Sequence, residues 1–109
     1  MTAAIFAPRA RRELVAAARW IRQDNPTAAR ALRDAVAKAA ERIGLHPAIG
    51  AVRGEFLPAP YRFLSLAGFS YVIVYNGDRN PPLIVAVLHT ARDLKRALRD
   101  VSDASGDTE

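Results

Sequence analysis

The sequence predicts an α+β fold: a short N-terminal strand, an antiparallel helix hairpin, a mainly antiparallel three- to four-stranded sheet and a short C-terminal helix. Apolar residues recur at helical spacing through the first part of the chain, and short runs rich in aromatic and β-branched residues follow. Asn25-Pro26 divides the helical part in two. The 109 residues fit one domain, which we expect over residues 1–101, with a polar, frayed tail at residues 102–109.

The first helix follows an apolar segment, Thr2–Ala7, which is either a strand or a leader. Pro8 suits the first position of a helix, where a missing N–H costs nothing, and we expect this helix to end at Asp24. Its apolar stripe consists of Ala10, Leu14, Ala17, Ala18 and Ile21.

The second helix begins at the link between the two helical segments. Asn25 is a favoured N-cap and Pro26 a favoured first helical residue, so we expect a helix to about Ile43 with Gly44 as its C′ residue. A link this short makes the two helices antiparallel. The second apolar stripe consists of Ala28, Leu32, Ala35, Val36, Ala39 and Ile43.

Three strands are predicted after a loop at residues 47–60 that is rich in glycine and proline. Tyr61–Leu66 and Phe69–Tyr75 flank Ala67-Gly68, which indicates a tight β-hairpin. Leu83–His89 is nearly all apolar, so we expect a central strand with both faces covered. One face of the second strand would hold Phe69, Tyr71, Ile73 and Tyr75, and the other Ser70, Val72 and Val74.

A last helix is predicted from its start signal. Thr90 and Asp93 have the spacing of a capping box, with aspartate in place of the usual glutamate. Leu94, Leu98 and Val101 would give this helix one apolar stripe.

The charge of the chain is strongly positive. Its net charge is +5. Residues 1–99 carry +9, because they hold all sixteen cations and only seven of the eleven acids. Fourteen of the cations are arginine, which suits bidentate contacts with carboxylate and phosphate. Such a field attracts nucleic acid or an acidic protein. Alternatively, the arginine and alanine content reflects a GC-rich genome, since composition does not place the arginines on one face.

Several kinds of function lack a signal in the sequence. There is no cysteine, and His46 and His89 are too far apart for a local metal motif, so we expect neither a metal nor a cofactor. There is no glycine-rich phosphate loop, and we expect no small-molecule substrate. No apolar run approaches the ~20 residues that span a bilayer, and the first eight residues do not resemble a signal peptide. We therefore expect a cytoplasmic protein.

Polar residues gather near the ends of the predicted strands: Arg62, Tyr75, Arg79 in a turn, His89, and Arg92 at the start of the last helix. The candidates for catalysis are Arg62, Tyr75, His89 and Arg92. In one interpretation they form a cluster that grips phosphate, with arginine for charge and His89 for proton transfer. In the other, which we favour, Arg62 extends from a sheet edge, Tyr75 packs, and His89 and Arg92 satisfy backbone groups or Asp93.

Several segments resemble the ParE branch of the RelE/ParE toxin superfamily, over about residues 3–99. They are Ala7–Ala10 with Leu14, Trp20 and Ile21; Asp24-Asn25-Pro26 with Ala28 and Ala29; Ile43, His46-Pro47 and Gly50; Tyr61-Arg62; Tyr71–Tyr75; and Val87–Asp93. The resemblance implies the toxin of a type II toxin–antitoxin pair. Such toxins are held inactive by a ParD-like antitoxin and are associated with poisoning DNA gyrase.

Two alternatives remain within the superfamily. RelE-like relatives cut messenger RNA on the ribosome, using basic residues and a tyrosine or histidine as acid–base groups. The sequence leans away from them, because residues 54–60 hold no lysine or arginine and His89 is followed by Thr90 rather than an aromatic residue. An inactive homologue would only bind its antitoxin. The gyrase target is inferred from the branch alone.

The alanine-lined helix pair offers a shallow apolar groove to a partner helix. We expect Trp20, Leu14, Leu32 and Arg62 to contact the antitoxin. An acidic antitoxin would complement the positive charge of the chain. Alternatively, Trp20 is a lid over the hairpin. A direct contact with nucleic acid is possible but is not the contact that the sequence favours.

Overall fold

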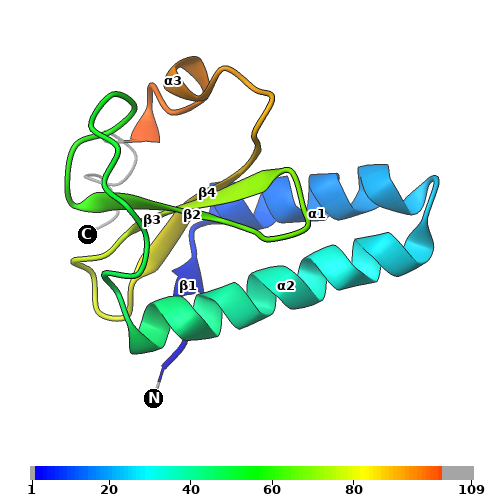
Figure 1. Ribbon diagram of the computed structural model, residues 1–109, viewed down its shortest axis with the longest axis horizontal. Helices are drawn as coiled ribbons and strands as arrows, with labels where there is room; N and C mark the ends of the chain where they lie inside the picture. Colours follow the sequence, from blue (N-terminus) through cyan, green and yellow to red (C-terminus); the bar gives the residue numbers. More distant parts are fainter. Residues whose placement is uncertain (1, 102–109) are drawn as a thin grey trace.

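The computed structural model describes residues 2–101, so the predicted tail at residues 102–109 lies outside the described part. The elements have the predicted order and form an α+β fold (Figure 1). None of the helices in residues 2–101 is both long and apolar enough to cross a bilayer. The elements are β1 (Ile5–Phe6), α1 (Pro8–Arg22), α2 (Pro26–Leu45), β2 (Tyr61–Ser65), β3 (Tyr71–Asn76), β4 (Leu83–His89) and α3 (Leu94–Ala97).

The four strands form one mixed sheet in the order β1-β4-β3-β2. β1 runs parallel to β4, and the other neighbours are antiparallel. The apolar strand β4 is central, as its sequence predicted. A turn forms at Ala67-Gly68, because the N–H of Phe69 donates to the carbonyl of Leu66 and Gly68 has a φ of 83°. The hairpin loop is nevertheless longer than the predicted two residues, because the Leu66 N–H donates to the carbonyl of Tyr71. The flanking strands are shorter than predicted, since β2 ends at Ser65 and β3 begins at Tyr71.

Each face of the sheet has its own core. The helical pair covers one face, and α3 with the loop before β2 covers the other (Figure 1). On β3 the predicted alternation is confirmed: Ile73 and Tyr75 face the helices, and Val72 and Val74 face α3. β4 breaks its alternation at a bulge, because Tyr75 pairs with Ile84 and Val74 with Ala86, so that Val85 has no partner.

The helix link follows the prediction. The Asn25 side chain accepts the N–H of Ala28 at 3.0 Å, which satisfies one donor of the first turn of α2. The prediction that Gly44 is the C′ residue was wrong, because α2 continues to Leu45. Gly44 lies inside the helix, where a Cβ atom would overlap the backbone of Thr2. The N-terminal segment therefore crosses α2 at the one position that has no side chain.

The start of the last helix also differs from the prediction. Asp93 is itself the N-cap of α3, and its carboxylate accepts the N–H of Arg96 at 3.2 Å. Thr90 precedes the cap, so the predicted capping box does not form. The Thr90 N–H instead extends the β3–β4 pairing by donating to the carbonyl of Ser70.

Candidate functional site

Two of the candidate residues hold the loop that follows α2. The Tyr75 hydroxyl donates to the carbonyl of Pro47 at 2.7 Å and accepts the N–H of Gly50 at 2.8 Å. Arg62, on β2, donates from Nη1 to the carbonyls of Gly50 at 2.8 Å and Ala48 at 3.4 Å. Both side chains thus satisfy backbone groups of one short loop, which the antiparallel pairing of Arg62 with Tyr75 brings within reach.

The environment of Tyr75 keeps its hydroxyl protonated. Burial raises the pKa of Tyr75 above its ordinary value of 10.0, against the opposing effects of the Gly50 hydrogen bond and the Arg62 charge. The side chain is fully buried. A Cβ atom at Gly50 would lie 2.9 Å from both the Tyr75 ring and the carbonyl oxygen of Phe63, so only glycine fits beside the hydroxyl. Tyr75 consequently acts as a tie for the loop and is closed to a substrate.

The other two candidates lie around the end of β4. The His89 ring meets the Tyr71 ring edge to face, with 5.1 Å between the ring centres. Its Nδ1 accepts the N–H of Ala91 at 3.0 Å, so the neutral ring carries its proton on Nε2. Arg92 is exposed, and its guanidinium has no hydrogen bond or ion pair with any of residues 2–101.

The four candidates therefore fall into two pairs instead of one cluster. Tyr75 pairs with Ile84, and His89 lies five residues farther along β4, about 17 Å away at ~3.4 Å per residue. Within residues 2–101 no three His, Asp or Glu side chains are grouped so that they could hold a metal ion. The interpretation that these residues are structural fits Arg62 and Tyr75, which both bond to backbone groups.

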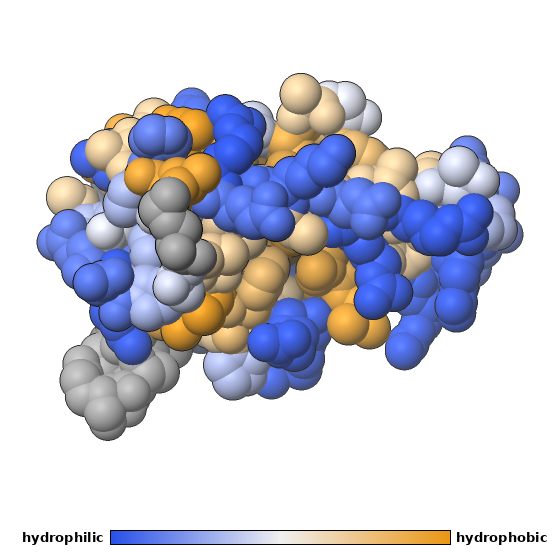
Figure 2. Space-filling view, turned by 90° about the horizontal axis from the view of Figure 1, so that it is seen from below, coloured by the Kyte–Doolittle hydropathy of each residue, from blue (hydrophilic) through white to orange (hydrophobic). Residues whose placement is uncertain are grey.

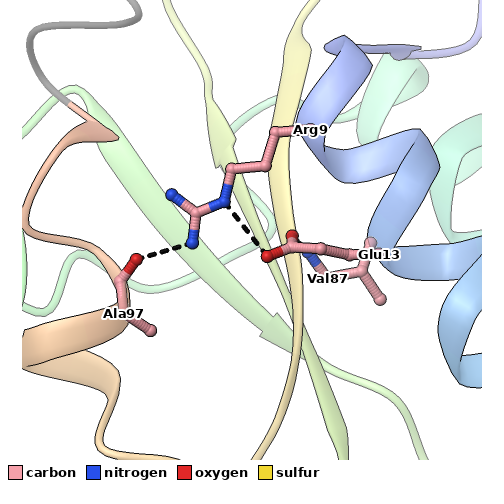
Figure 3. Close-up of polar contacts among 4 residues, drawn as sticks. All are labelled: Arg9, Glu13, Val87 and Ala97. Atoms are coloured by element: carbon pink, nitrogen blue, oxygen red, sulfur yellow. Dashed lines mark hydrogen bonds and ion pairs between the residues drawn. The ribbon is translucent and has the colours of Figure 1, made fainter.

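Sequence reasoning missed a polar bridge between α1, β4 and α3 (Figure 3). Glu13 accepts the N–H of Val87 through Oε1 at 2.9 Å and the Arg9 guanidinium through Oε2 at 3.0 Å. Arg9 also donates to the carbonyl of Ala97 at 2.6 Å. Because β1 ends at Phe6, β4 has a strand partner at Val87 only on the β3 side, and on the other side the carboxylate takes the place of a strand. A signal was available, since Glu13 is the one acid in α1 and lies four residues after Arg9.

The predicted antitoxin contacts are placed very differently from one another. Trp20 is 71% exposed on α1, so the alternative in which it is a lid over the hairpin does not hold. Leu14 is partly buried against the core. Leu32 has an exposure of 0%, because it lies at the centre of that core, and it is not available to a partner in this conformation. Arg62 and Trp20 lie near opposite ends of α2, which has 20 residues and is about 30 Å long.

The outer side of the helical pair carries a shallow hollow of about 350 Å³. Two facing stripes line it, and each has helical spacing of i, i+3, i+4 and i+7. Hydrophilic side chains gather at the end of the pair that projects past the sheet (Figures 1 and 2). The lining residues are Val15, Ala18, Arg19 and Arg22 from α1 and Pro26, Ala29, Arg30 and Arg33 from α2.

A comparison with known protein families gives a match. A family model described as the ParE toxin of the type II toxin–antitoxin system, parDE, matches residues 4–94. The match covers every strand and both long helices. No curated protein sequence matches the chain.

Proposed function

Because the chain belongs to the ParE toxin family of type II toxin–antitoxin systems, we propose that it is neutralised by a ParD-like antitoxin and acts by inhibiting DNA gyrase. The family match over residues 4–94 carries this proposal. The toxin binds its target without chemistry of its own. The side chains of Tyr75 and Arg62 form hydrogen bonds with the backbone of the chain itself. This supports a binding role, because an RNA-cleaving site needs such groups to face a substrate.

The proposed target leads to a first prediction. Purified chain added to gyrase, ATP and relaxed plasmid is expected to block supercoiling and to leave added RNA intact. Gel electrophoresis of the plasmid and the RNA measures both. A chain inactivated by heat is the control, and prior mixing with the antitoxin is expected to restore supercoiling.

Two outcomes would contradict the gyrase proposal. Codon-positioned cuts of messenger RNA in a translating extract, lost in His89→Ala, would place the chain with the RNA-cleaving relatives. His89 suits this test because it is half-buried at a strand end and its side-chain hydrogen bond is to the nearby Ala91 N–H. Normal growth of cells that express the chain without antitoxin would indicate an inactive homologue.

The proposed antitoxin contact leads to a second prediction. Trp20→Ala is expected to weaken antitoxin binding about 30-fold, equivalent to ~2 kcal/mol, because exposed tryptophans act as interface anchors. The melting temperature is expected to change little, since the side chain is 71% exposed in the free chain. Calorimetric titration and thermal unfolding measure the two quantities. Leu45→Ala, at a residue 46% exposed near the other end of the pair, is the matched control. An unchanged dissociation constant for Trp20→Ala would remove Trp20 from the interface.

A further inference from the structure

We propose that the outer side of the helical hairpin binds the phosphate backbone of duplex DNA through a track of arginines. The track consists of Arg11, Arg12, Arg19, Arg22, Arg30 and Arg33. This contact is separate from the proposed effect on gyrase, because it needs only the chain and DNA.

The track is continuous across two neighbouring hollows. The hollow between the helices takes two arginines from each helix. A second hollow, of about 380 Å³, lies farther toward the start of α1 and is lined by Arg11 and Arg12. Val15 and Arg19 line both hollows, so the two join into one surface along α1. The sequence left open whether the arginines share a face, and the structure brings six of them together.

The guanidinium groups of the track make no hydrogen bond or ion pair within the described part of the chain. All six arginines are exposed, and none has an ion pair or hydrogen bond through its side chain with residues 2–101. Only Arg11 has a described contact, with the Phe6 ring at 5.9 Å. No carboxylate lines either hollow. Glu13, the one acid of α1, is occupied by Arg9 and Val87. The positive charge is therefore free to act on a ligand.

The floor of the hollow favours a ligand bound by charge. Ala18 and Ala29 are 7% and 4% exposed, so the seam between the helices is closed by small side chains. Val15 is the one apolar side chain larger than proline that lines either hollow, so the apolar part of the surface is small beside its six arginines. Phosphate groups need only the guanidinium forks at the rim, which bind phosphate oxygens in pairs. The small floor and unpaired rim together favour phosphate over an acidic protein at this place.

The length of the track suits a polyanion with regular charge. Arg11 and Arg22 are eleven residues apart on one helix, which separates them by about 16 Å along its axis. One strand of duplex DNA carries about five phosphates over that distance, at ~3.4 Å of axis each. The arginines on α2 widen the track, so that it contacts the backbone over an area.

Fluorescence anisotropy with a labelled duplex of about 20 base pairs and mixed sequence tests the proposal. The track variant replaces Arg19, Arg22, Arg30 and Arg33 with glutamine. The control variant replaces Lys38, Arg42, Arg96 and Arg99 with glutamine; these residues are exposed and line neither hollow of the track. Both variants lower the net charge from +5 to +1, so the comparison between them tests where the charge is lost. Thermal unfolding of both confirms that they fold.

The wild-type chain is expected to bind the duplex with an affinity that falls as salt rises. The track variant is expected to bind about 10-fold or more weakly and to flatten the log–log salt slope by about 3–4, at ~0.9 per lost phosphate contact. The control variant is expected to lose less than about 3-fold. Equal losses in the two variants, or no binding by the wild type at low salt, would overturn the proposal. Poly-glutamate that binds the track more tightly than the duplex would instead assign the track to an acidic protein.

Discussion

Glu13→Ala is expected to lower the free energy of unfolding by about 2–3 kcal/mol, because it leaves two donors without their acceptor. The Val87 N–H lies on the β1 side of β4, past the end of β1 at Phe6, and no strand replaces the lost carboxylate. Arg9 loses its ion pair and becomes a partly buried charge, with its side chain 29% exposed. Urea unfolding measures the change, and hydrogen exchange of the Val87 amide is expected to become faster than that of its neighbours in β4.

Glu13→Gln separates the hydrogen bond from the charge. The amide oxygen still accepts the Val87 N–H, so this variant is expected to lose about 1 kcal/mol, near the mean for one hydrogen bond. Glu55→Ala is the matched control, because Glu55 pairs with Arg53 at 3.7 Å and its side chain is 61% exposed. Exposed pairs contribute about 0–1 kcal/mol, so little change is expected. If Glu13→Ala and Glu55→Ala lost equal stability, the bridge would be a surface feature without a role in holding α1 on the sheet.

Tyr75→Phe is expected to lower the free energy of unfolding by about 2 kcal/mol, since the buried Gly50 N–H and Pro47 carbonyl both lose a partner. The melting temperature is expected to fall by about 4–8 °C for each kcal/mol. Tyr71→Phe is the control, because it also removes one hydroxyl but keeps the ring against His89. Loss of equal size in both variants would show that the loop does not depend on the Tyr75 hydroxyl.

The same residue gives the chain a dependence on alkaline pH. Burial raises the pKa of Tyr75, so the folded chain keeps this proton at a pH where the unfolded chain releases it. The stability from this group is complete below the ordinary pKa of 10.0 and is lost as the pH rises through the higher folded value. Denaturant unfolding from pH 9 to 11 is expected to show a shallower decline in Tyr75→Phe than in the wild type.

The sequence predicted features that depend on local signals. Asn25-Pro26 set the helix link, because capping and the fixed φ of proline act within a few residues. The nearly all-apolar run of Leu83–His89 predicted the central strand, and the period of two on β3 predicted its two faces. The family resemblance was also predictable from the sequence, because the segments that carry it stand along this chain in the order typical of the family.

Features that depend on distant contacts were not predictable. Gly44 looked like a helix end, but the crossing by Thr2 that explains it lies 42 positions away in sequence. Tyr75 and His89 both lie at the carboxyl ends of apolar strands, which suggested one cluster. β3 and β4 are antiparallel neighbours, however, so their carboxyl ends lie at opposite ends of the strand pair. The partner of Glu13 is a backbone amide exposed by the shortness of β1, and no side-chain pattern reports it.

The projecting end of the helical pair has a consequence for how such a chain diverges in evolution. Its small inner residues, Ala18 and Ala29, are buried at the seam yet belong to neither of the two cores. Arg19, Arg22, Arg30 and Arg33 beside that seam make no side-chain hydrogen bond or ion pair with residues 2–101, so selection on stability leaves their positions open. Recognition and folding thus draw on separate residues. Substitutions at this end can change what it binds during evolution, while the sheet and the hydrogen bonds of Glu13 and Tyr75 are conserved by the needs of folding.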